Sequence, residues 1–252
     1  MSRLRLLLLC AVLALVAAAC QMRAEVDIRV SEDGSGTVVV SVTLDREAAG
    51  RLGDPATALR LDDLRQAGWK VDEPAAADGG GLTIVGRRDF ASADQLGAVL
   101  DEVGGTDGIF RSTELGISDG FSSTTYDFTT TVELSGSLEQ FSDADLAAAL
   151  EGLPLARSAE ELTAEGATEG DAATLDVVVE MPGGEPETNG EPVDGASTWS
   201  FSASGGEAVS EQLRATSTRS GAPVGLYVAI AALAALGAIA ALVVGLVARR
   251  GR

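Results

Sequence analysis

Both ends of this 252-residue chain are apolar, and they confine an independently folding domain to the residues between them. Near the N-terminus, Arg3 and Arg5 accompany an apolar run over residues 4–16, and small residues follow it. A basic start, a short apolar run and a small-residue cleavage region are typical of a secretory signal peptide, which we predict over residues 1–19. We therefore expect the mature domain on the extracytoplasmic side of a cell membrane.

Cys20 directly follows the small residues of the predicted signal peptide. A cysteine at this position resembles the bacterial lipobox, in which the thiol receives acyl chains such as palmitate and becomes the new N-terminus. Ala17 departs from the leucine usual three residues before that cysteine. The alternative is ordinary cleavage after Ala19, which leaves Cys20 as a free thiol.

The C-terminal segment over residues 224–248 contains no charged residue and is rich in Ala, Leu, Val and Ile. Its length suits a helix that crosses a bilayer, so we predict a single transmembrane helix over residues 223–248. The basic tail over residues 249–252 is expected on the cytoplasmic side. Small residues at four-residue spacing favour self-association of this helix; they are Gly237, Ala241 and Gly245.

Charge and composition exclude several classes of function. The chain has 18 basic and 38 acidic residues, a net charge of −20, which argues against nucleic acid as a partner. It has no histidine and two cysteines, so a Ser-His-Asp triad, an imidazole metal site and a four-cysteine zinc site are all excluded. A hydrophobic content of 46% is nevertheless enough for a packed core.

Alternating apolar residues predict a sheet over most of residues 20–201. The clearest segments are residues 26–30 and 37–44, which form a hairpin, residues 82–90, and a second hairpin over residues 109–134. Helices are predicted over residues 54–68, 92–103 and 142–150. We therefore predict an α+β fold with an antiparallel sheet and helices packed on one face, followed by a polar tether over residues 202–222.

The order of several short motifs resembles one protein family. The lipobox-like cysteine is followed by the hairpin sequence V-D-I-R-V-S-E-D-G-S-G-T-V-V-V, then by Gly68-Trp69, by Trp199-Ser200-Phe201 and by the apolar segment with its arginines. In this order the motifs resemble the LppM family of mycobacterial-type envelope lipoproteins. The resemblance implies an α/β domain similar to lipid-binding folds, a role with envelope glycolipids, and no catalytic residue.

Two groups of residues are candidates for function. Aromatic residues on or beside the predicted strands could line a lipid site, although plain core packing explains them equally well. They are Trp69, Phe90, Phe110, Phe121, Tyr126, Phe128 and Phe141. Basic residues near the two ends of the domain are expected beside an anionic membrane surface or as solvated linker residues; they are Arg23, Arg214 and Arg219.

The expected function is a membrane-anchored, non-enzymatic lipoprotein whose exported domain binds lipid or glycolipid of the envelope. Acidic pairs such as Asp62-Asp63 are expected on the exposed surface of a helix. The one lysine, Lys70, is not part of the S-x-x-K motif of a serine–lysine dyad. No calcium-loop motif is present, so no metal or cofactor is expected. The alternative is a protein–protein interaction module of a membrane or cell-wall complex.

Overall fold

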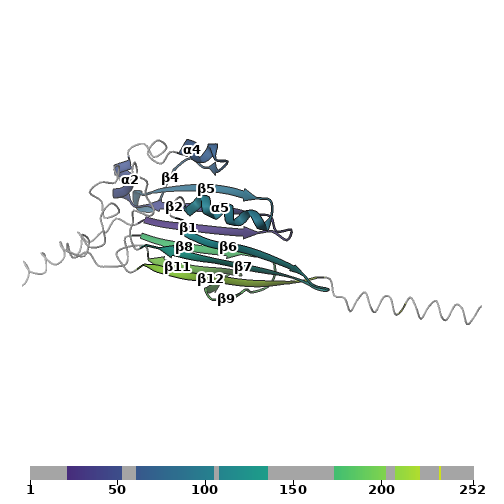
Figure 1. The fold of residues 1–252 in the computed structure, drawn as a ribbon. Coiled ribbons are helices and arrows are strands. Elements are labelled where there is room, and N and C mark those ends of the chain that lie inside the picture. The colour runs from purple at the N-terminus through teal and green to yellow at the C-terminus, as the bar shows by residue number, and fades with distance from the viewer. Residues whose placement is uncertain are drawn as a thin grey trace, which may run out of the picture.

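The computed structural model describes residues 22–52, 61–104, 108–135, 173–202 and 208–221, together with Leu233. Within these ranges the protein is mostly β-structure arranged in two sheets (Figure 1).

Sheet A is built around the strand pair β1 (Met22–Val30) and β2 (Gly36–Leu44). β5 (Leu82–Phe90) pairs with β2, and β8 (Ala173–Glu180) pairs with β1. The β1–β8 pairing is parallel, so sheet A is mixed rather than antiparallel throughout. The sheet is completed at its edges by β3 (Lys70–Val71), β4 (Ala75–Ala76), β10 (Glu191–Val193) and β11 (Ala196–Ser202).

Sheet B has four strands in the order β6-β7-β12-β9. β6 (Phe110–Asp119) and β7 (Ser123–Leu134) form a hairpin, and β12 (Val209–Ser220) pairs with β7 along its whole length. β9 (Glu187–Thr188) adds a short edge beside β12.

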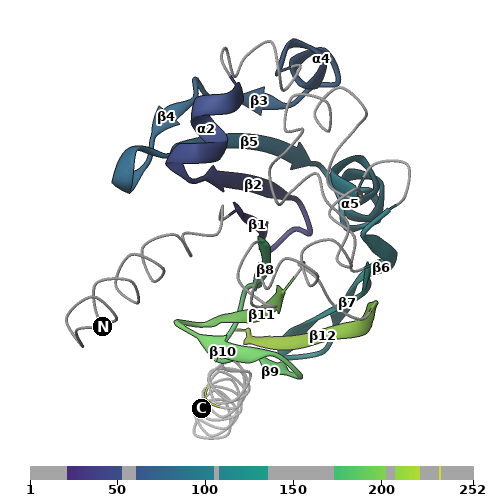
Figure 2. The same cartoon turned by 90° about the vertical axis from the view of Figure 1, so that its left-hand side faces the viewer.

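The described helices are short. They are α2 (Arg46–Leu52), α4 (Leu61–Gln66), α5 (Leu96–Gly104) and the 3₁₀ turns η1 (Asp78–Gly80) and η2 (Ala93–Gln95). Seen along the strands, sheet A curves, with sheet B and α5 on one side of it (Figure 2).

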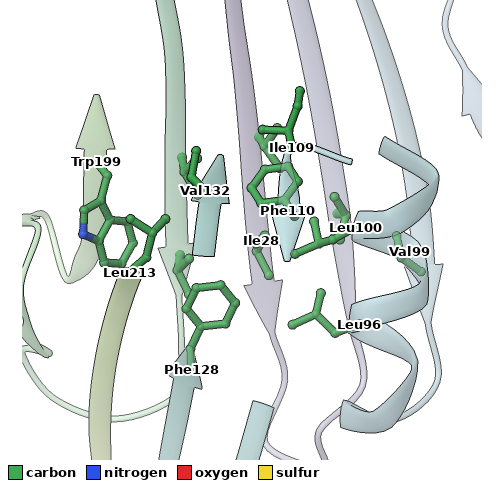
Figure 3. Packing of buried hydrophobic residues seen from close by; sticks show 14 of the residues in the cluster. Ile28, Leu96, Val99, Leu100, Ile109, Phe110, Phe128, Val132, Trp199 and Leu213 are labelled. Carbon is green, nitrogen blue, oxygen red and sulfur yellow. The ribbon is translucent and has the colours of Figure 1, made fainter. Parts of the chain in front are cut away.

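A single apolar core joins both sheets and α5 (Figure 3). In α5, Leu96 and Leu100 face Ile28 of β1 and Phe110 of β6, and all four side chains are fully buried. The alternating residues of β7 and β8 pack in the same cluster. Because each sheet leaves one apolar face that water would otherwise contact, packing the two faces together is the main source of stability.

The predicted α+β fold class is wrong, because the described residues are mostly β-structure with short helices. The domain is not one antiparallel sheet covered by helices but two sheets packed face to face, with α5 beside them. The predicted polar tether over residues 202–222 contains β12, and the short strands β9 and β10 were not predicted. Sequence alternation is weak in β12 because its buried positions are Leu213, Ala215 and Ser217, of which only one is large and apolar.

The predicted transmembrane helix is not seen. Apart from Leu233, the segment over residues 223–248 lies outside the described residues. In the parts of the chain that the structure describes, no helix has the length and apolar character needed to cross a bilayer. The predicted signal peptide, Cys20 and the helix predicted over residues 142–150 also lie outside the described residues.

Candidate functional site

The structure places most of the predicted lipid-lining aromatic residues in the core that the sheets share. Trp69, Phe90, Phe110, Tyr126 and Phe128 are all buried members of this cluster. Phe121 lies apart from them and is 90% exposed at the β6–β7 turn, and Phe141 lies outside the described residues. The aromatic residues therefore stabilise the fold, and lipid contact by them remains a prediction.

The three predicted membrane-proximal arginines are strand residues, and the structure does not bring them together. Arg23, near the start of β1, pairs with Asp176 at 3.8 Å, and Arg219, near the end of β12, pairs with Glu32 at 2.8 Å. Arg214 lies in the middle of β12, where its side chain donates to Gln212. Since Glu32 follows the end of β1, Arg23 and Arg219 lie at opposite ends of the strands.

In the part of sheet A furthest from sheet B, the strands also present an apolar face. It consists of the side chains on the inner side of β2, β5 and β3, and we call it the β2–β5 face. On one side Val42 lies opposite Ala24, and on the other side it lies opposite Ile84. Along this face, Val40, Val42, Leu82 and Val71 are partly buried, and two of them, Val40 and Val71, pack against the core. The other apolar residues of the face are buried; they are Val38, Leu44 and Ile84. The β2–β5 face is thus less well covered than the core between the sheets.

Trp69 closes one end of the β2–β5 face. Its ring lies over Gly86, where an added Cβ atom would lie 3.4 Å from the ring, at van der Waals distance. The indole Nε1 donates a hydrogen bond of 3.0 Å to Oε2 of Glu102 on α5. The other oxygen of Glu102 lies 3.5 Å from Nη2 of Arg88, on β5. This cluster of Trp69, Arg88 and Glu102 places hydrogen-bonding groups at the end of an apolar strip.

Gly68, directly before Trp69, leaves space for the Arg88 side chain. Gly68 has φ +95°, and a Cβ atom there would collide with the Arg88 guanidinium. Glycine is suited to this position because it adopts a positive φ without steric cost and leaves space for the neighbouring group. The turn also ends α4, with Trp69 N donating to Leu64 O at 3.0 Å.

On the outer side of the same sheet, ion pairs fix β3 to β5. Lys70 Nζ lies 2.6 Å from Asp89 Oδ2, and Arg87 lies 2.6 Å from Asp72. The hydrogen bond from Lys70, with a second from Thr37, holds the pKa of Asp89 below its usual value. These contacts position β3, and therefore Trp69, without contributing to the β2–β5 face itself.

Asn189, which was not identified from the sequence, connects β11 of sheet A to β12 of sheet B. Its Oδ1 accepts hydrogen bonds from Trp199 Nε1 at 3.2 Å and from Arg214 N at 2.8 Å, and its Nδ2 donates to Gln212 O at 2.7 Å. The Asn-Gly pair at 189–190 is a turn signal, but the contacts to β12 depend on tertiary structure.

At the end of the molecule where β1 turns into β2, Tyr126 connects the two sheets. The Tyr126 ring is buried, and its hydroxyl donates a hydrogen bond of 2.9 Å to the backbone carbonyl of Glu32. Burial raises the pKa of Tyr126, because the charged phenolate would lose its hydration there.

Among the described residues, no group of three or more His, Cys, Asp or Glu side chains is arranged to hold a metal ion. The Arg88–Glu102 pair can exchange hydrogen bonds with hydroxyl groups, and the valines beside it can contact a hydrocarbon.

These features define a two-sheet β domain with one partly covered apolar face and a polar cluster at its end. No family model matches the chain, and no curated protein matches it significantly. The NMR structure of the folded domain of LppM from Mycobacterium tuberculosis is similar at 13% sequence identity and a TM-score of 0.41, covering 80% of this chain and 92% of that chain. This likeness is too distant to assign the chain to that family, so the family resemblance remains a prediction.

Proposed function

We propose that the chain is a non-enzymatic envelope lipoprotein whose exported domain binds a lipid or glycolipid on the β2–β5 face. The single observation that carries the proposal is the incomplete burial of two of the three inward-facing valines of β2, Val40 and Val42; the third, Val38, is buried. On neighbouring β1, the inward-facing residues Val26 and Ile28 are buried. A sheet face that is apolar but incompletely covered is suited to a hydrocarbon chain.

The polar cluster supports an amphiphile rather than a purely apolar ligand. The Arg88 and Glu102 side chains are 28% and 39% exposed, so each retains hydrogen-bonding capacity toward a ligand. A guanidinium, a carboxylate and an indole together supply donors and acceptors for sugar hydroxyls or for a phosphate. In this arrangement an acyl chain lies along Val40 and Val42, and its headgroup lies beside Arg88.

The predicted location agrees with such a ligand. Cleavage before Cys20 and lipidation of its thiol would leave one residue between the lipid and the first residue of β1, Met22. A domain held this close to a membrane surface has direct access to its lipids.

The test compares two tryptophan substitutions at neighbouring sites of one strand. Val42→Trp fills the β2–β5 face, whereas Val39→Trp adds the same ring on the outer side of β2, because successive strand residues point to opposite sides. Binding of a fluorescent phospholipid and its displacement by envelope glycolipids are measured for both variants. We expect Val42→Trp to reduce binding about ten-fold or more, and Val39→Trp to bind like the unmodified protein.

Equal binding by both variants would contradict a site on this face. A lack of lipid binding by the unmodified protein, together with saturable binding of a specific envelope protein, would favour the protein–protein module instead.

A further inference from the structure

The turn between β6 and β7 carries the most exposed large apolar side chain among the described residues. Phe121 is 90% exposed, whereas the other aromatic side chains of the described strands are buried. Exposing a phenyl ring to water is unfavourable, and neither the core nor the β2–β5 face uses it. Phe121 therefore has no role in the fold as described.

Hydrogen bonds hold the turn that presents Phe121. Gly120 N donates to Ser123 O at 2.7 Å, and Thr124 Oγ1 donates to Asp119 Oδ1 at 2.8 Å. Gly221 N, at the end of β12, donates to Ser122 O at 2.7 Å. Phe121 is thus presented by a braced, three-stranded tip, which we define as residues 118–124 and 219–221.

The tip extends beyond the rest of the domain. Tyr126 and Arg219 both contact Glu32 in the β1–β2 turn, and the β6–β7 turn with Phe121 lies beyond these contacts. Three strand residues from Tyr126 to Ser123 add roughly 10 Å at 3.3 Å per residue. Figure 1 shows β6, β7 and β12 converging beyond the ends of the other strands.

The tip is also nearly neutral in a strongly acidic domain. Its own charged residues are Asp119 and Arg219, and Arg219 pairs with Glu32 of the β1–β2 turn, whereas residues 20–222 contain 13 basic and 38 acidic residues. An anionic surface therefore repels this tip less than it repels the rest of the domain. Three residues after Gly221, the sequence enters the uncharged apolar stretch of residues 224–248.

From these observations we infer that the β6–β7 tip is a membrane-contacting element and that Phe121 inserts into the interfacial region of the lipid bilayer. The occupant is lipid because the ring is single and protruding, is surrounded by small hydroxyl residues, and lies beside Gly221, which precedes the apolar stretch of residues 224–248 by three residues in the sequence. Serine and threonine hydroxyls remain hydrated among headgroups while the ring enters the acyl boundary. This inference rests on the proposed membrane location but not on the β2–β5 face.

The inference also constrains how the domain is oriented relative to the membrane. Met22 and the tip lie at opposite ends of the strands, and the 9 residues of β1 alone span roughly 30 Å. If a lipid on Cys20 and the ring of Phe121 enter the same bilayer, the strands must lie close to the membrane plane. An upright domain that stands on the tip would hold Cys20 out of reach.

The test uses the full chain with a tryptophan at the tip. Phe121→Trp is reconstituted into vesicles of phosphatidylcholine and phosphatidylglycerol, with or without lipids brominated near the headgroup. The matched control is Leu64→Trp on α4, an exposed position beside the β3 edge of sheet A. Emission from Trp69 and Trp199 is removed by subtracting the spectrum of the unmodified chain.

We expect the added emission of Phe121→Trp to shift to shorter wavelength and to fall about two-fold with brominated lipid, whereas Leu64→Trp changes in neither respect. If the chain cosediments with vesicles but the added tryptophan emission neither shifts nor is quenched, the contact between the tip and the membrane is overturned, whereas the membrane location is not. A blue shift without quenching would mean that protein covers the ring, which also overturns it. Failure of the chain to cosediment would overturn the membrane location and the inference together.

Discussion

The contact between Trp69 and Glu102 gives the most quantitative test of how the polar cluster is built. Trp69→Phe removes the indole N–H and part of a buried ring. Roughly 50 Å² of lost apolar burial costs about 1 kcal/mol at 25 cal/mol/Å². A hydrogen bond to a charged group contributes about 1.5–3 kcal/mol when shielded. Because Glu102 is 39% exposed, water can replace part of this contribution, and we expect about 1 kcal/mol from it.

The expected loss for Trp69→Phe is therefore about 2 kcal/mol in the free energy of unfolding. A double-mutant cycle with Glu102→Ala isolates the hydrogen bond, because the loss of packing and of the Arg88 pair cancels in the cycle. We expect a coupling energy of about 1 kcal/mol, measured by urea unfolding of a soluble fragment of residues 21–221.

Trp199→Phe is the matched control, because Trp199 is also buried but donates to Asn189. Its cycle with Glu102→Ala should give no coupling beyond about 0.3 kcal/mol. If the Trp69 cycle gives a value as small as the control, the hydrogen bond does not organise the cluster and the reasoning is refuted.

Three further predictions concern the fold. The fragment of residues 21–221 should unfold cooperatively in calorimetry, whereas residues 21–208, which lack β12 and its buried Leu213, should not; equal cooperativity would show that β12 is dispensable. Ser197→Ala should leave the free energy of unfolding unchanged or raise it by up to about 1 kcal/mol, because no partner for the buried hydroxyl occurs among the described residues; a loss of stability in urea unfolding would contradict this. Tyr126→Phe should cost about 1 kcal/mol near neutral pH through loss of the bond to Glu32. The raised pKa keeps Tyr126 neutral in the folded state, whereas the phenol of the unfolded chain ionises near pH ~10. The unmodified protein should therefore lose stability above that pH, and the difference in the free energy of unfolding between it and Tyr126→Phe should shrink. A difference that stays constant with pH would argue against the raised pKa.

The strands with strong alternation were predictable from the sequence. The β1–β2 hairpin, β5 and the helix after Ser92 lie where the pattern predicted them. The hairpin strands have apolar residues at every second position, the helix has them at helical spacing, and β5 has Leu82, Ile84 and Phe90 on one face. β12 was not predictable in this way. Its buried Ala215 and Ser217 lie opposite Phe128 and Tyr126 of β7, and Ser217 Oγ donates a hydrogen bond to Pro182 O. These partners exist only in the folded structure.

The candidate site was predictable only in part. Trp69 was recognised as an aromatic candidate, but Arg88 and Glu102 meet it through tertiary structure and carry no local signal. Aromatic residues of a core and of a ligand site have the same hydropathy, so the sequence could not separate them. Likewise, only the tertiary packing distinguishes the partly buried Val40 and Val42 from the buried valines of the same sheet.

Native mass spectrometry of the domain, released from its natural membrane without detergent extraction of bound lipid, tests the lipid-binding proposal most directly. We predict that the unmodified domain and Val39→Trp carry a lipid or glycolipid of defined mass, one molecule per chain, and that Val42→Trp carries none. A lipid-free spectrum for the unmodified domain, or the same bound lipid on Val42→Trp, would contradict the proposal that the β2–β5 face binds lipid.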